Sequence, residues 1–164
     1  MLPSCSAPLR FSQVSYDASV INNFVDNEDA GFIFFQFKRL ETRGPKNSLS
    51  LTGYVYKNDQ TLLSETAYDA TVITPGKSIY FKNGSVLGNL LISKNKLLES
   101  LLTDPDTHER IKYTSLLFTP QRYDDNIHIY YEITLQGAEQ KFLKFMLAAR
   151  PCPPAVNCIS KPGQ

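Results

Sequence analysis

Apolar and polar residues alternate along residues 126–136, which is the clearest pattern in the chain. Apolar side chains occupy every second position, at Ile127, Ile129, Tyr131, Ile133 and Leu135. A period of two places these side chains on one face of a strand and the polar side chains on the other face. Strands with one buried and one solvated face are typical of antiparallel sheets. The pattern therefore predicts antiparallel β structure.

Other segments carry strand patterns of the same kind. Residues 49–55 alternate in the same way, whereas residues 32–37 are apolar on both faces, which predicts a central strand covered by other layers. Asn83-Gly84 lies between two strand-like runs and predicts a tight hairpin turn. The chain holds about eight or nine such strands with turns every ~8–12 residues, a spacing typical of a sandwich or a small barrel.

Residues 93–103 depart from the β pattern. Their apolar residues recur at helical spacing, at Leu97, Leu98, Leu101 and Leu102. Ser93 can cap the start of a helix and Asp104-Pro105 can end it. We expect one short inserted helix here, either as a lid over one end of the sheets or as a surface for a partner. Residues 17–29 are polar and acidic, with a few apolar residues suited to a helical turn or a docked loop.

The predicted fold is all-β, an antiparallel β-sandwich with one inserted helix. In layout it resembles the immunoglobulin-like and transthyretin-like sandwiches. The 164 residues suit one domain, and a chain of this size buries about 70% of its unfolded surface, so it needs no metal to fold. We expect a domain over residues 11–150, a flexible N-terminal tail over 1–10 and a Pro/Cys-rich tail over 151–164.

The charge balance argues against two classes of partner. The chain has 17 basic and 16 acidic residues, a net charge of +1, and no basic stripe of the kind that binds nucleic acid. It also has no apolar run near the ~20 residues of a transmembrane helix. We therefore expect no nucleic-acid partner and no membrane contact except through a lipid anchor.

The sequence offers little that could carry catalysis. A Ser or Cys nucleophile needs a base and a third group that orients the base, and His108 and His128 are the only ready bases. His108 belongs to a polar loop and His128 to the polar face of a strand, and the chain holds none of the common catalytic motifs. We therefore expect a protein that is not an enzyme.

Four aspartates could in principle converge on a cation. They are Asp104, Asp106, Asp124 and Asp125, in two loops. A dedicated calcium loop would alternate Asp or Asn with a Gly and a distal Glu, and these loops do not. We expect no metal and no cofactor.

The three cysteines give a sharper indication. Cys152 and Cys158 flank a short proline-rich loop, and a disulfide between them would contribute about 2 kcal/mol and imply an oxidising compartment. Free thiols and a metal site are the alternatives. The third, Cys5, ends Leu2-Pro3-Ser4-Cys5, which resembles the end of a bacterial lipoprotein signal with a lipid-bearing cysteine. A free cysteine in a flexible start is the alternative for Cys5.

These features predict a non-catalytic, exported binding module. In layout the chain is similar to small bacterial envelope lipoproteins, including accessory subunits of secretion complexes and surface assemblies. That resemblance implies a periplasmic or outer-membrane location, a lipid anchor at Cys5 and a protein or glycan partner. One alternative is a lipocalin-like carrier of a small ligand, although the chain has no Trp and its apolar strand faces are suited to filling a core. A cytosolic interaction domain is the other alternative.

Overall fold

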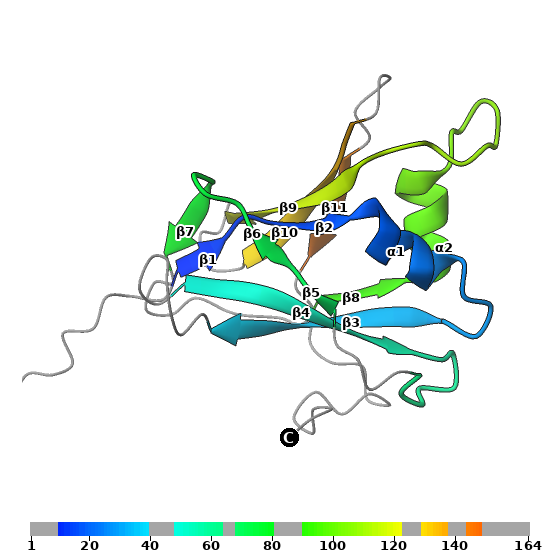
Figure 1. The fold of residues 1–164 in the computed structure, drawn as a ribbon, viewed down its shortest axis with the longest axis horizontal. Coiled ribbons are helices and arrows are strands. Elements are labelled where there is room, and N and C mark those ends of the chain that lie inside the picture. The colour runs from blue at the N-terminus through cyan, green and yellow to red at the C-terminus, as the bar shows by residue number, and fades with distance from the viewer. Residues whose placement is uncertain are drawn as a thin grey trace, which may run out of the picture.

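The computed structural model describes residues 10–39, 48–63, 68–80, 90–122, 129–137 and 144–148. Most of these residues form strands, which assemble into two sheets, and two short helical segments accompany the sheets (Figure 1). The predicted all-β class is therefore confirmed.

The first sheet has the strand order β7-β1-β4-β3-β8, and β5 also pairs with β4. Its strands are β1 (Arg10–Ser12), β3 (Phe32–Arg39), β4 (Ser48–Tyr56), β5 (Tyr68–Asp69), β7 (Ser78–Tyr80) and β8 (Leu90–Ser93). Its described pairs are antiparallel except for β1 with β4, which is parallel. This pair departs from the predicted antiparallel arrangement. Parallel strands need a long connection, and residues 13–47 connect β1 to β4.

β3 is the central strand that its apolar sequence predicts. It lies between β4 and β8, and residues from both of its faces are buried. Ile33 and Phe35 contribute to the core between the sheets, and Phe32 and Phe34 on the opposite face are 8% and 2% exposed. A strand buried on both faces needs apolar residues at consecutive positions.

The second sheet has the strand order β11-β10-β9-β2-β6, and its described pairs are antiparallel. Its strands are β2 (Val14–Asp17), β6 (Thr71–Val72), β9 (Ser115–Arg122), β10 (Ile129–Gln136) and β11 (Lys144–Ala148). The alternation predicted for β10 is confirmed from Ile129 to Leu135, since its apolar positions are buried in the core.

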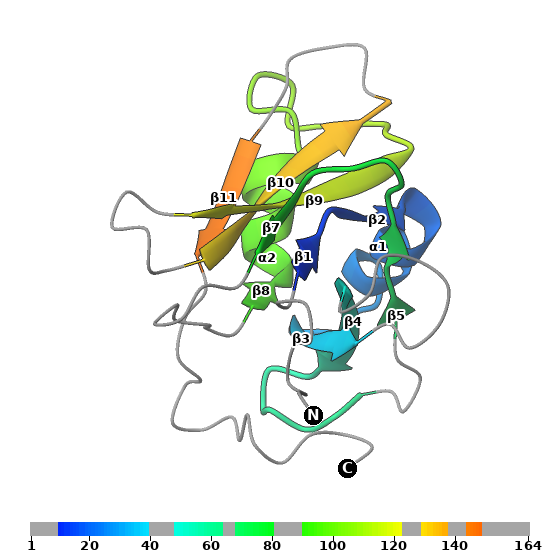
Figure 2. The same ribbon diagram turned by 90° about the vertical axis from the view of Figure 1, so that its left-hand side faces the viewer.

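Two extended stretches pass from one sheet to the other and join the sheets along one side (Figure 2). Gln13 alone separates β1 in the first sheet from β2 in the second, and Ala70 alone separates β5 from β6. The first sheet curls into a half-barrel. The crossing at Gln13 positions the candidate site described below.

Side chains from both sheets meet in one core cluster. Phe118 of the second sheet packs at 5.5 Å from the ring of Tyr16 and at 5.4 Å from the ring of Phe35 in the first sheet, both edge to face. Such aromatic pairs contribute about 0.5–1.5 kcal/mol each beyond their buried area. The Tyr16 hydroxyl donates to the Tyr68 carbonyl oxygen at 2.8 Å, which satisfies its buried polar end.

The helix predicted near 93–103 is confirmed. It comprises α2 (Lys94–Leu97) and a wider π-helical turn, η1 (Leu98–Leu102). The Ser93 hydroxyl accepts a hydrogen bond from the Lys96 N–H at 3.1 Å and so caps the start, as expected. Leu97, Leu101 and Leu102 are buried in the core between the sheets.

A second helix, α1 (Ala18–Val25), forms in the segment for which the sequence is compatible with either a helical turn or a docked loop. The expectation of a single helix is therefore wrong. Ile21, Phe24 and Val25 bury one face of α1 in the core, and three apolar residues within one turn are too few to produce a clear helical period. Neither helical segment of the described chain is long and apolar enough to cross a membrane.

Candidate binding site

Several residues singled out in the sequence lie outside the described part of the chain. They are Cys5, Cys152, Cys158, Asp124, Asp125, His128 and the Asn83-Gly84 turn. The disulfide between Cys152 and Cys158 and the lipid at Cys5 therefore stay predictions.

The described aspartates form a turn. Asp104 Oδ1 accepts hydrogen bonds from the backbone N–H groups of Asp106 at 2.8 Å and Thr107 at 3.3 Å, the pattern of an Asx turn. His108 follows with a positive φ of 61°, and its N–H donates to the Asp104 carbonyl oxygen at 2.8 Å. Within the described ranges no three potential metal-ligating side chains converge.

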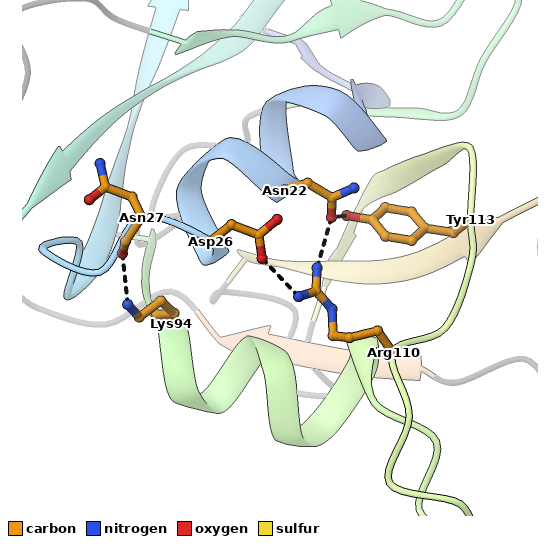
Figure 3. Close-up of polar contacts among 6 residues, drawn as sticks. All are labelled: Asn22, Asp26, Asn27, Lys94, Arg110 and Tyr113. Atoms are coloured by element: carbon orange, nitrogen blue, oxygen red, sulfur yellow. Dashed lines mark hydrogen bonds and ion pairs between the residues drawn. The ribbon is translucent and has the colours of Figure 1, made fainter.

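The chain after this turn is fastened to α1 by four side chains, Asn22, Asp26, Arg110 and Tyr113, which we call the α1 clamp (Figure 3). Arg110 Nη1 lies 2.9 Å from Asp26 Oδ1, and Arg110 Nη2 donates to Asn22 Oδ1 at 3.0 Å. The Tyr113 hydroxyl donates to the same Asn22 oxygen at 3.0 Å. Each of these contacts joins the loop after Thr103 to the helix.

The environment of Tyr113 in the α1 clamp shifts the pKa of its phenol. Burial raises the pKa of the Tyr113 phenol to about 12, the nearby Arg110 charge lowers it and Asp26 raises it. Beside the clamp, Lys94 Nζ donates to the Asn27 carbonyl oxygen at 2.8 Å and so ties the start of α2 to the end of α1. All of these contacts are internal to the protein, so the clamp has the features of a structural element.

A second polar region lies where β1 passes into β2, at Gln13, which is only 9% exposed. The Gln13 backbone N–H donates to the Lys77 carbonyl oxygen at 2.9 Å, and its carbonyl accepts from the Ile73 N–H at 2.9 Å. Its side-chain Oε1 accepts from the Lys77 N–H at 3.1 Å, and Nε2 donates to Thr119 Oγ1 at 2.8 Å. One buried glutamine thus fixes both ends of the turn between β6 and β7, and both ends of its own amide have partners.

A cavity of about 210 Å³ lies between β1 and this turn. It is lined by Arg10, Ser12 and residues 72–78, and we call it the turn cavity. The turn includes a cis peptide bond between Thr74 and Pro75. A Cβ atom at Gly76 would lie 2.6 Å from the Ile73 carbonyl oxygen and 3.1 Å from Gln13 Oε1, so this wall of the cavity requires glycine.

The lining of the turn cavity is basic. Arg10 and Lys77 contribute positive charge, and the described residues of the lining include no Asp, Glu, His or Cys. Arginine, lysine and hydroxyl groups can bind a ligand through charge and hydrogen bonds. The arrangement is suited to binding.

Arg10 connects the cavity to Tyr80. Its Nη2 donates to the Tyr80 hydroxyl at 3.0 Å, and its guanidinium carbon lies 5.1 Å from the centre of the Tyr80 ring. The Arg10 Nε–H is out of contact with solvent and has no hydrogen-bond partner among the described residues. Tyr80 is 47% exposed, and Arg122 donates to its backbone carbonyl.

Sequence reasoning does not find the turn cavity. It places Arg10 in the N-terminal tail, whereas the structure places it in β1. Arg10 and Lys77 are also too far apart in the chain for any local pattern to connect them. Arg10 and Lys77 line the same cavity because β1 pairs with β7.

Comparisons of the chain with protein-family models, with curated proteins and with solved structures find no match.

Proposed function

We propose that the protein is a non-catalytic β-sandwich module that binds a protein or glycan partner through the turn cavity. The observation that carries this proposal is the basic lining of the cavity, in which no described residue is acidic. The rigid turn around Gln13 supports it as well, since a preformed site loses less conformational entropy when a ligand binds.

We infer further that the two sheets are the layers of a sandwich with a filled interior. The large core cluster with residues from both sheets supports this. A lipocalin-like carrier would instead need an internal space for its ligand. The turn cavity, at about 210 Å³, is smaller than the ~300–1,000 Å³ of typical small-molecule sites. Its size suits one residue-sized group of a larger partner.

We also propose that the protein is exported to the bacterial envelope, with lipid at Cys5 and a disulfide between Cys152 and Cys158. The count of three cysteines, one pair and one remaining, supports this. Thiol titration of the denatured, unreduced protein tests the disulfide. One free thiol per chain is expected, and three would contradict the bridge and favour the cytosolic alternative.

An NMR titration of the ¹⁵N-labelled protein tests the binding site. The probes are neutral sugars, acidic sugars and short capped peptides of either charge, each added separately. At least one probe class should shift backbone signals of residues 10–13 and 72–80 while signals of the α1 clamp stay in place. Shifts confined to other regions, or none with any probe, would contradict the proposal.

A further inference from the structure

We propose that the turn cavity binds an acidic sugar residue, whose carboxylate is held by Arg10 and Lys77 and whose ring lies against Tyr80. This inference rests on the proposed function and names the chemical class of the ligand. It follows from three observations: the charge of the lining, the exposed ring beside it and the occupied strand edge next to that ring.

The charge of the lining calls for an anion. In the described residues, Lys38 pairs with Asp69 and Arg110 pairs with Asp26, whereas Arg10 and Lys77 form no ion pair. A guanidinium binds a carboxylate through a pair of parallel N–H groups. The Arg10 Nε–H has no hydrogen-bond partner among the described residues. A carboxylate in the cavity would give this donor an acceptor.

The exposed ring suits a sugar. Tyr80 is the one large apolar side chain that is exposed among the described residues. An aromatic ring with a polar end offers a flat apolar face and a hydroxyl, the two kinds of surface that a sugar ring can contact. Ser12, Thr74 and Ser78 add hydroxyl groups to the lining of the cavity for hydrogen bonds with sugar hydroxyls.

The neighbouring strand edge disfavours a peptide. β7 is the edge strand of the first sheet, and a peptide could in principle extend the sheet there by backbone pairing. However, Arg122 donates to the Tyr80 carbonyl, so a backbone acceptor that an added strand would use already has a donor. A residue-sized cavity beside an occupied edge fits a sugar residue better than an extended peptide.

The experiment is an NMR titration of the full chain with D-glucuronate, D-glucose, acetate and a capped aspartate-containing peptide. Glucuronate should shift the signals of residues 10–13 and 72–80, and its affinity should exceed those of glucose and acetate by about tenfold or more. Added salt should weaken its binding, because the carboxylate is held by charge. The Arg10→Met and Tyr80→Leu variants should each weaken glucuronate binding about tenfold.

Arg110→Met is the matched control, because it removes an arginine from the α1 clamp and should leave glucuronate binding unchanged. Arg10→Lys, which keeps the charge but not the paired N–H groups, should retain part of the affinity. If glucose binds as well as glucuronate, the cavity is a binding site but the acidic ligand class is refuted. If the peptide binds at the cavity and glucuronate does not, the partner is a protein. If no probe shifts the cavity signals, the proposed function itself fails.

Discussion

The two ends of the molecule each carry a prominent arginine, and the two arginines have opposite surroundings. Arg110, near α1 and α2, contacts Asp26 and Asn22. Arg10 belongs to β1, at the other end of the long axis (Figure 1), and among the described residues its side chain donates a hydrogen bond only to the neutral Tyr80. The comparison teaches that a polar cluster whose groups satisfy one another contributes to the fold. We propose that a cation without an acidic partner beside a cavity binds a ligand.

At the end of the molecule that holds β1, Gln13 and Arg10 differ in what their side chains do. Gln13 uses its backbone and both ends of its amide to hold the turn, so it should matter for stability. The Arg10 side chain lies on the wall of the same cavity and makes one hydrogen bond among the described residues, to Tyr80. Substitution of Gln13 should therefore affect stability, and substitution of Arg10 should affect ligand affinity.

Gln13→Ala should have the largest effect on stability, a loss of about 1–3 kcal/mol in the free energy of unfolding. It removes the partners of the Lys77 N–H and of Thr119, whose side chain is buried. Urea denaturation measures the loss. Gln121→Ala is the matched control, because no side-chain hydrogen bond of Gln121 is found among the described residues. Equal losses in the two variants would contradict a holding role for Gln13.

Tyr113→Phe should lower stability by about 1 kcal/mol near neutral pH, since it removes one hydrogen bond to Asn22. It should also change the response to alkali. The folded-state pKa of Tyr113 is raised from 10.0 to about 12, so its contribution is complete below pH 10 and is lost as pH rises toward 12.

Urea unfolding of wild type and Tyr113→Phe across that pH range checks the alkaline response. The wild type should lose more stability than the variant between pH 10 and pH 12, the range set by the two pKa values. Parallel curves for the two proteins would show that the Tyr113 phenol has the same pKa in the folded and unfolded states. The α1 clamp would then not shield it from water.

Arg110→Met and Arg10→Met should give the smallest effects on stability, and the two should differ. Arg110→Met should cost about 0.2–1 kcal/mol, more at low salt, because its ion pair with Asp26 is partly exposed. Arg10→Met should change stability by less than about 0.5 kcal/mol, since it removes one exposed hydrogen bond together with an unpaired buried donor. Thermal unfolding at low and high salt distinguishes them. A larger loss for Arg10→Met would make Arg10 structural.

Much of the fold could be predicted because its core follows local periods. The alternation from Ile129 to Leu135 corresponds to the buried face of β10, and the helical spacing of Leu97, Leu101 and Leu102 corresponds to the buried face of α2 and η1. Such periods arise whenever one face of an element is buried, so they are visible in a single sequence.

The candidate site could not be predicted because it depends on long-range pairing. Arg10 and the turn that follows β6 meet only because β1 pairs with β7 and because Gln13 bonds to both ends of the turn. A buried glutamine also has no sequence signature, since nothing in the neighbouring residues marks it as buried. Long-range pairing of this kind leaves no period along the chain.

The most direct test of the account is the NMR signal of the arginine Nε–H groups with and without D-glucuronate. The Arg10 signal can be assigned as the one missing from Arg10→Met, and the Arg110 signal from Arg110→Met. Glucuronate should move the Arg10 Nε–H signal, because the carboxylate supplies a partner that this donor lacks among the described residues. The Arg110 signal should not move. An unchanged Arg10 signal at a glucuronate concentration that saturates the cavity would contradict the account.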